Sequence, residues 1–295
     1  MDYILEIKNL TKKFGRLTAV NDISFNVEKG NVYGLLGPNG SGKSTTLGML
    51  LTTINATSGS WKWFGESTDH QTLKRIGAII ERPNFYPYLN AGQNLEITAK
   101  IKGVDQKKID EKLSLVGLLE RKKDKFLTYS LGMKQRLAIA SAALNDPEVL
   151  ILDEPTNGLD PMGIIQIREI IQKIANDGTT IILASHLLDE VEKVCSHVIV
   201  LKNGRSLYSG LVDGMTNNKG FFELRASNMN FLEAALKKAG NFNKIINNNG
   251  LIRATIEQDI SAEDLNKLLF ESNISLSHLV KKRDSLEEQF LELVK

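Results

Sequence analysis

The sequence predicts a two-domain α/β protein, in which a larger domain with a mostly parallel sheet is followed by a smaller α+β domain. Two observations lead to this prediction. Apolar, strand-like runs alternate with helical patterns between residues 31 and 201, an alternation typical of parallel sheets. Beyond residue 220 the order becomes strand–helix–strand–strand–helix–strand. At 295 residues the chain is long enough for two hydrophobic cores.

The first part of the larger domain is expected to be antiparallel. Residues 1–36 alternate polar and apolar positions in several places, as half-buried strands do, and 31–36 is a short apolar run that can be a buried strand. Residues 84–145 show no strand signal, so we expect a helical subdomain there. Strands are then predicted at 149–152, 179–183 and 197–201, with helices at 163–176 and 186–194.

A glycine-rich stretch between Asn203 and Gly220 marks the expected boundary, which divides the chain into residues 1–212 and 213–295. In the second part, Asn249-Gly250 separates two strand-like runs and is a strong hairpin signal. The resulting β-α-β-β-α-β order is the ferredoxin-like pattern. A last helix is expected to carry its apolar residues on one face: Leu286, Phe290, Leu293 and Val294.

Composition excludes several classes of protein. The net charge is only +2, which gives no electrostatic reason to expect a nucleic-acid partner. The single cysteine, Cys195, leaves no disulfide within the chain, which suits a reducing compartment. Cys195 lies on an apparent helix, where we expect it to be a packed core thiol and not a reactive one. We find neither a secretory signal at the start nor an apolar run of about 18 residues, so any role at a membrane is expected to come through a partner.

Residues 37–45, GPNGSGKST, fit the phosphate-loop pattern between a strand and a helix. Glycines in such a loop let backbone N–H groups turn toward one anion, and the helix N-terminus adds partial positive charge. We expect Lys43 to reach the β- and γ-phosphates of ATP and the Ser44 hydroxyl to bind Mg²⁺. The other nucleotide-binding residues expected in this loop are Gly37, Asn39, Gly40, Ser41, Gly42 and Thr45.

A second phosphate-site element follows the strand at 149–152. Asp153 is expected to hold Mg²⁺, and Glu154 to act as general base on the attacking water. The alternative is an ordinary strand exit with solvated acids, which the phosphate loop upstream disfavours. Ser130 and Gly132 open a further helix, where a capping serine and uncovered N–H groups make another anion site. Such caps are common, so this site gains weight only from its position shortly before Asp153.

With these motifs the chain resembles the ATPase subunit of ABC transporters over about residues 4–210. Residues 37–45 look like Walker A, 150–155 like Walker B, 129–133 like the signature motif and 157–160 like the D-loop. The resemblance implies that Phe14 stacks on adenine, that Asp160 belongs to the nucleotide site, and that His186 donates to the γ-phosphate. A lone histidine at a strand end would otherwise be a structural residue.

The same resemblance implies partners and a location. Two copies would bind two ATP head to tail and drive a polytopic permease from the cytoplasmic face of the membrane. Two departures, Leu131 and Met133 in the signature and Glu81 where glutamine is usual, resemble the bacitracin-resistance and lantibiotic-immunity exporters. Glu81 would then lie near Mg²⁺, and residues 82–95, whose aromatics Phe85, Tyr86 and Tyr88 are expected to be exposed, would dock the permease. The alternative for Glu81 is drift at a tolerant surface position.

Two other functions are compatible with some of these motifs. A non-transport ABC ATPase could act on DNA or ribosomes, but only 109 positions separate Lys43 from Leu152, without sustained heptads, and the chain carries one cassette. The second domain could also be a ligand sensor or a dimer interface, which is compatible with transport. Its alternative is a stabilising appendage, and the sequence leaves that choice open.

Overall fold

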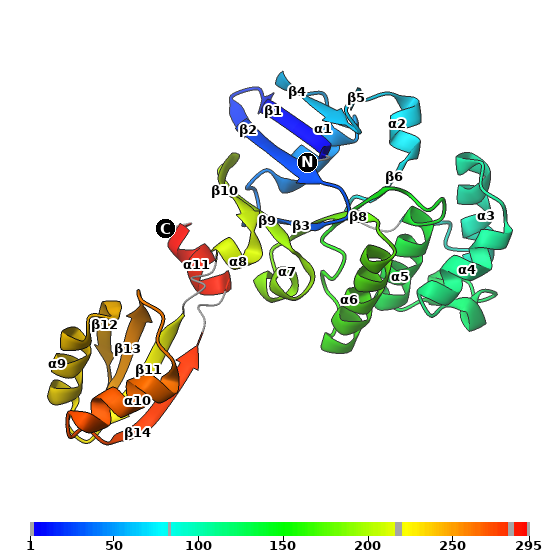
Figure 1. Cartoon of the computed structure of the whole chain (residues 1–295). Coiled ribbons are helices and arrows are strands. Elements are labelled where there is room, and N and C mark those ends of the chain that lie inside the picture. The colour runs from blue at the N-terminus through cyan, green and yellow to red at the C-terminus, as the bar shows by residue number, and fades with distance from the viewer. Residues whose placement is uncertain (1–2, 82–83, 216–219, 283–285, 294–295) are drawn as a thin grey trace. The chain divides into compact units, whose positions relative to one another are not determined.

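The computed structural model describes residues 3–81, 84–215, 220–282 and 286–293 (Figure 1). Its first sheet is antiparallel, in the order β2-β1-β4-β5. The expected antiparallel group 1–36 is wrong at its end, because residues 32–36 belong to the other sheet. These five residues are all buried, as in a strand covered on both faces, whereas the end of β2 alternates. The strands are β1 (Tyr3–Phe14), β2 (Leu17–Glu28), β4 (Ser58–Trp63) and β5 (Glu66–Ser67).

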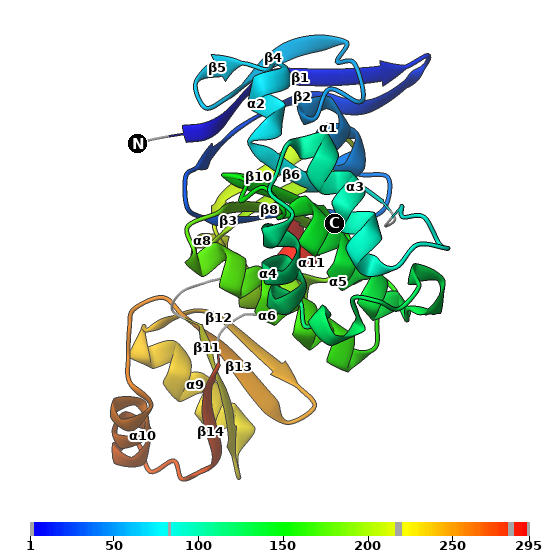
Figure 2. The same ribbon diagram turned by 90° about the vertical axis from the view of Figure 1, so that its right-hand side faces the viewer.

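The central sheet has the order β10-β9-β3-β8-β7-β6, and only β10 runs antiparallel to its neighbour. Helix α1 and the antiparallel sheet cover one face, and α5, α6 and α7 lie on the other (Figures 1 and 2). The strands are β3 (Val32–Leu36), β6 (Ile76–Ile79), β7 (Val149–Asp153), β8 (Thr180–Ser185), β9 (His197–Lys202) and β10 (Arg205–Leu211). The covering helices are α1 (Lys43–Leu50), α5 (Leu131–Ala142), α6 (Pro161–Asn176) and α7 (Leu188–Val194).

Residues 84–145 are helical, as expected. Helix α3 begins after Asn90, whose side chain forms a capping box with Gln93. Phe85 was expected to be exposed, but it is half-buried because its ring packs 5.1 Å from that of Phe126. The elements of this part are α3 (Ala91–Lys102), α4 (Lys107–Leu115), the 3₁₀ turns η1 (Leu119–Arg121) and η2 (Phe126–Thr128), and α5; the short helix α2 (His70–Lys74) precedes β6.

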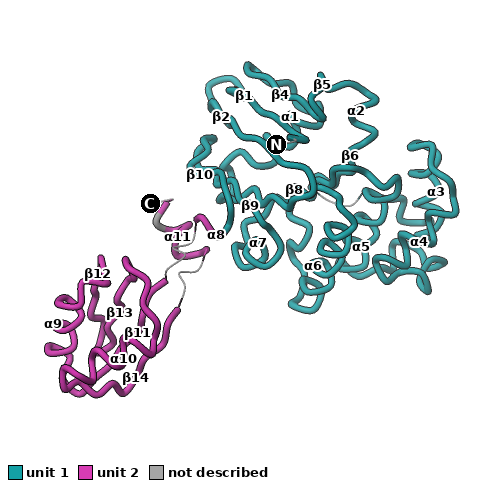
Figure 3. The backbone as a smooth tube through the Cα atoms, in the orientation of Figure 1, with its two compact units in different colours: residues 1–212 teal, residues 213–295 magenta. Residues whose placement is uncertain are grey.

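The chain divides into two compact units, residues 1–212 and 213–295 (Figure 3). The second unit has the expected ferredoxin-like order, with an antiparallel sheet β12-β13-β11-β14. Its hairpin turns at Asn249 and Gly250, both at positive φ. The elements are α8 (Val212–Met215), β11 (Phe221–Ala226), α9 (Met229–Ala239), β12 (Phe242–Asn248), β13 (Leu251–Ile256), α10 (Ala262–Glu271), β14 (Leu276–Lys282) and α11 (Leu286–Leu293).

The last helix, α11, carries Leu286, Phe290 and Leu293 of the expected apolar face at helical spacing. Leu286 is buried, Leu293 is 39% exposed, and Val294 lies outside the described residues. Cys195 is a packed thiol whose pKa is raised by burial, as expected for an inert side chain. Within the described parts of the chain, every helix is too short or too polar to cross a membrane.

Candidate functional site

Three neighbouring parallel strands end at one edge of the central sheet and carry the predicted motifs. Strand β8 lies between β3 and β7, with Leu36 in register with Ser185 and Asp153 in register with Ala184. The phosphate loop therefore starts beside Ser185-His186 and Asp153-Glu154. Sheet topology thus brings together three segments that are far apart in the sequence, at the carboxyl edge where α/β proteins bind ligands.

The phosphate loop is held by close backbone packing. A Cβ added at Gly37 would lie 2.4 Å from the Leu201 carbonyl oxygen. A Cβ added at Gly42, whose φ is 106°, would lie 2.7 Å from the Ala19 carbonyl oxygen. Only glycine fits these two places without moving the surroundings. The Ser41 hydroxyl is buried and has no hydrogen-bond partner. An unpartnered donor in a loop of this shape is suited to an anionic oxygen.

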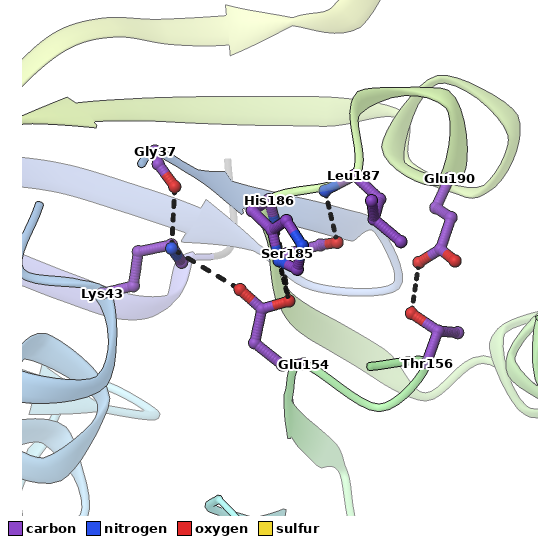
Figure 4. A network of polar contacts seen from close by, with 8 residues as sticks. All are labelled: Gly37, Lys43, Glu154, Thr156, Ser185, His186, Leu187 and Glu190. Carbon is purple, nitrogen blue, oxygen red and sulfur yellow. Dashed lines mark hydrogen bonds and ion pairs between the residues drawn. The ribbon is translucent and has the colours of Figure 1, made fainter. Parts of the chain in front are cut away.

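Lys43 projects from the first turn of α1 into the centre of the site (Figure 4). Its side chain is 6% exposed, and Nζ donates to the Gly37 carbonyl at 2.7 Å. Nζ also lies 3.5 Å from Oε1 of Glu154. The lysine is therefore extended along the phosphate loop and already paired with the carboxylate proposed as general base.

Glu154 is fixed in an unusual backbone conformation. Its φ is 49°, in the left-handed region, and its N–H donates to the Ala184 carbonyl at 2.9 Å. Oε2 lies 2.7 Å from Nδ1 of His186 and accepts from the backbone N–H of His186 at 3.4 Å (Figure 4). The expected helix 186–194 begins only at Leu188, which leaves His186 in the turn that faces Glu154.

Asp153 is the best metal-binding candidate among the described residues. Its side chain is buried, and Oδ1 has no hydrogen-bond partner. Burial raises the pKa of Asp153, and a hydrogen bond with the Ser44 side chain lowers it. The charge of Glu81 also raises this pKa, so Glu81 lies within electrostatic reach. A serine hydroxyl beside an unpartnered carboxylate oxygen offers the hard oxygen ligands that Mg²⁺ takes.

A cleft of about 480 Å³ opens beside these groups. Phe14 is 48% exposed at its wall, and Lys12 Nζ lies 4.7 Å from the centre of that ring. An exposed ring at the edge of a phosphate site can stack on a base. The predicted residues that line the cleft are Phe14, Asn39, Gly40, Ser41, Gly42, Lys43, Ser44, Thr45 and Glu154.

The structure does not bring the signature motif to this cleft. Ser130 caps α5 by accepting from the Met133 N–H at 3.3 Å, and the nearest atom to a Cβ at Gly132 would be a Leu159 methyl at 3.9 Å. Neither residue is among those that line the cleft of the described chain. Asp160 lies outside the lining as well, and its carboxylate caps α6 through the Gly163 N–H at 2.9 Å.

Sequence reasoning missed one wall of the cleft. Asn203 lines it from the β9–β10 turn, and the next residue, Gly204, donates to the Ser41 carbonyl at 3.0 Å and accepts from the Asn21 N–H at 2.7 Å. We interpreted this Asn-Gly pair only as the start of a domain boundary. An Asn-Gly pair is also a hairpin signal, and it could have predicted a turn between two strands of the central sheet at this point.

Comparisons with known proteins point to one family. The ABC transporter family model matches residues 20–157. The bacitracin transport ATP-binding protein BcrA of Bacillus licheniformis is 40% identical over 100% of this chain and 98% of its own length. The lantibiotic transport ATP-binding protein SrtF of Streptococcus pyogenes is 42% identical over 74% of this chain and 96% of its own.

Solved structures give the same result. The cbiO1 protein from Clostridium perfringens, part of the transporter complex cbiONQ, has a TM-score of 0.66 and 30% identity over 72% of this chain and 90% of its own. A dimeric ATP-binding cassette in a post-hydrolysis state, bound to ADP and phosphate, has a TM-score of 0.62 and 28% identity over 70% of this chain and 98% of its own.

Proposed function

The chain belongs to the ABC transporter family of ATP-binding proteins, and we propose that it is the ATPase motor of a membrane exporter for an antimicrobial peptide or a related amphipathic compound. One observation carries the ATPase function: Lys43, Glu154 and His186 converge beside a cleft of about 480 Å³. The exporter function is supported by full-length similarity to a bacitracin transport protein.

Binding of ATP would break the contacts that now hold Glu154. Lys43 would turn its charge toward the β- and γ-phosphates, and the phosphate loop would supply backbone N–H groups. With Nδ1 donating to Glu154, a neutral His186 has only an acceptor left at Nε2, so it must leave Glu154 to donate to a phosphate oxygen. Released from both partners, Glu154 can accept a proton from water as general base.

We propose that Mg²⁺ is held by Ser44 and Asp153 together with phosphate oxygens, and that Glu81 lies close to the ion. The unpartnered Oδ1 of Asp153 supports this assignment. No cluster of three or more His, Cys, Asp or Glu side chains converges in the described parts of the chain, so an ion would need ligands from the nucleotide. The ion would neutralise phosphate charge during transfer.

A second copy would complete the site. Ser130 and Gly132 lie away from the cleft of their own chain, and Ser130 is exposed. We propose that this helix end grips the γ-phosphate bound by another copy, so that ATP links two chains head to tail. The dimeric cassette among the similar structures supports this arrangement. Asp160 would belong to the same interface.

We propose that a polytopic permease docks beside β6, at the cytoplasmic face of the membrane. A groove of about 430 Å³ lies there, lined by Tyr86, Ile101 and Lys102 among others. Tyr86 is 50% exposed and Ile101 79% exposed, so both offer apolar surface to a short helix. The proposed docking segment runs over residues 82–95, of which 82 and 83 lie outside the described residues.

The second unit is proposed to be an accessory to the motor. The lantibiotic relative SrtF matches 74% of this chain at 96% of its own length, so it has no room for the whole of residues 213–295. This difference in length supports the proposal that the role of the second unit is separable from ATP hydrolysis. A ligand sensor, a dimer interface and a stabilising appendage remain the three proposals for it.

Isolation of the complex tests the proposed function. The tagged full chain is expressed in its own host, and the proteins that co-purify from detergent-solubilised membranes are identified. The account predicts a polytopic membrane protein in stoichiometric amount, lost when the groove is blocked by Ile101→Glu. Co-purification of ribosomes or DNA in place of that protein would overturn the exporter function.

A further inference from the structure

A buried hydrogen bond joins two side chains behind the catalytic groups. The Thr156 hydroxyl donates to Oε2 of Glu190 at 2.6 Å, and the two residues are 4% and 5% exposed (Figure 4). Neither side chain lines the nucleotide cleft. The pair therefore has no direct contact with ATP to explain it.

The bond connects the two segments that carry Glu154 and His186. Thr156 follows Glu154 in the turn after β7, where Asn157 N–H donates to the Glu154 carbonyl at 3.1 Å. Glu190 lies in the first turn of α7, four residues after His186 in the chain. The β7–β8 ladder ends at the Asp153–Ala184 pair. Beyond this pair, three contacts hold the segments together: the hydrogen bond from the Glu154 N–H to the Ala184 carbonyl, the Glu154–His186 side-chain contact, and the Thr156–Glu190 hydrogen bond.

Packing alone does not explain a carboxylate at this place. Oε1 of Glu190 is buried without a partner, and burial raises the pKa of this side chain despite the Thr156 hydrogen bond. The charge of Arg168, from α6, lowers that pKa, yet Nε of Arg168 is also buried and unpartnered. Buried charges that are incompletely paired cost stability relative to apolar residues of similar size.

We propose that the Thr156–Glu190 hydrogen bond holds Glu154 and His186 in register for ATP hydrolysis, which makes Thr156 and Glu190 positioning residues. This inference rests on the proposed roles of Glu154 and His186. When ATP draws His186 away from Glu154, one of the side-chain contacts between the two segments is lost. The Thr156–Glu190 bond does not involve the nucleotide and can keep the segments aligned through that exchange.

The test is a double-mutant cycle on the ATPase activity of the purified full chain. Thr156→Val removes the hydroxyl and keeps the shape, and Thr156→Ser keeps the hydroxyl. We expect Thr156→Val to lower kcat by about 10- to 100-fold with little change in KM, since small misplacements of catalytic groups have effects of this size. Thr156→Ser should recover most of that loss. Thr72→Val is the matched control, because it removes a hydroxyl–carboxylate bond of 2.7 Å, to Asp69, far from the cleft.

The cycle separates positioning from mere stability. In a His186→Ala background, measured with radiolabelled ATP, Thr156→Val should change the residual kcat by less than about twofold, because residues that act as a unit are non-additive. Thr156→Val should lower the melting temperature by the same amount in the parent and in the His186→Ala background. Glu190→Gln supplies a second cycle without any change at Thr156.

Three results would overturn the inference: an unchanged kcat in Thr156→Val, an equal fall in kcat in both backgrounds, or an equal fall in Thr72→Val. Glu154→Gln is measured alongside. If it is inactive while Thr156→Val is normal, only the positioning role is lost. If Glu154→Gln itself turns over normally, the proposed site is wrong.

Discussion

Nζ of Lys43 lies 3.5 Å from Oε1 of Glu154, so the lysine proposed to bind phosphate is paired with the carboxylate proposed to activate water. Lys43 is 6% exposed and Glu154 is 20% exposed, so water screens this pair only in part. For Glu154 to act as proposed, nucleotide would have to replace this pairing. In the proposed mechanism, this contact would keep Glu154 and Lys43 out of their working positions until ATP binds.

Removal of the Glu154 charge should separate binding from hydrolysis. Glu154→Gln keeps the size of the side chain but cannot accept a proton from water, so steady-state hydrolysis should fall by about 10²–10⁴. The same change frees Lys43 from an anionic partner, and ATP should bind at least as tightly as to the parent. Phosphate release and nucleotide binding by the purified chain are the two measurements. Near-normal turnover would rule out Glu154 as the base.

Asp153→Asn should stabilise the chain without nucleotide. A buried carboxylate oxygen without a partner costs about 1–3 kcal/mol, which corresponds to a melting temperature some 2–8 °C higher when it is neutralised. The folded pKa of Asp153 is raised, so the penalty is present at neutral pH and is relieved as pH falls through the folded pKa. The difference in melting temperature from the parent should therefore narrow toward acid pH.

The same substitution should weaken the response to Mg²⁺. With Asp153→Asn, addition of Mg²⁺ to the ATP-bound chain should raise the melting temperature less than in the parent, since a neutral amide is a poorer Mg²⁺ ligand than a carboxylate. Thermal unfolding with ATP, with and without Mg²⁺, checks this. An equal rise in parent and variant would argue against a metal role for Asp153.

Ser130→Arg should block ATP-dependent dimerisation and leave ATP binding intact. In a Glu154→Gln background, ATP should convert the monomer into a dimer, because binding and dimerisation are linked. The arginine would fill the exposed helix end that is proposed to face the second copy. Light scattering with and without ATP measures the mass. Asp69→Arg is the control, since it removes the N-cap of α2 and should still allow the dimer.

Absence of an ATP-dependent mass change in Glu154→Gln itself would contradict the head-to-tail cycle. If the Ser130→Arg variant dimerises at the same ATP concentration as the protein without this substitution, the signature helix is not part of the interface.

Glu81→Ala should uncouple hydrolysis from export. Glu81 is exposed, at φ 62°, two residues after β6 and near the charge of Asp153, so it can respond to the Mg²⁺ site and to a docked permease. ATP binding should remain nearly normal while cellular protection is lost. Glu81→Gln should be milder, because it keeps the reach and one acceptor. ATPase rate and protection, measured for both variants in the assembled complex, decide the matter; full protection by Glu81→Ala would exclude a coupling role.

The sequence predicted the parts of the fold that depend on local signals. The phosphate loop, the strand before Asp153 and the Asn249-Gly250 hairpin each carry their own chemistry, and the structure has them where expected. The wrong assignment of residues 32–36 to the antiparallel group shows the limit of such signals. Which sheet a buried strand joins is set by its partners far along the chain, here β8 and β9, and not by its own composition.

The site was predictable as motifs and less so as contacts. Periodicity did not reveal that β8 would lie between β3 and β7, which places His186 beside Glu154. The sequence also did not predict the Thr156–Glu190 hydrogen bond or the place of Asn203 in the lining of the cleft. Both depend on segments that are distant in sequence. Phe85 was misjudged because an aromatic in a polar loop gives no sign of the ring that will cover it.

Survival under bacitracin or a lantibiotic tests the central claim most directly. Cells lacking the chain are given back either the parent or Glu154→Gln at equal expression, and the inhibitory concentration of each compound is measured. The account predicts that the parent restores resistance to at least one of them and that Glu154→Gln does not. Equal protection by the two proteins, or no change in sensitivity to any such compound when the chain is absent, would contradict an ATP-driven exporter of antimicrobial peptides.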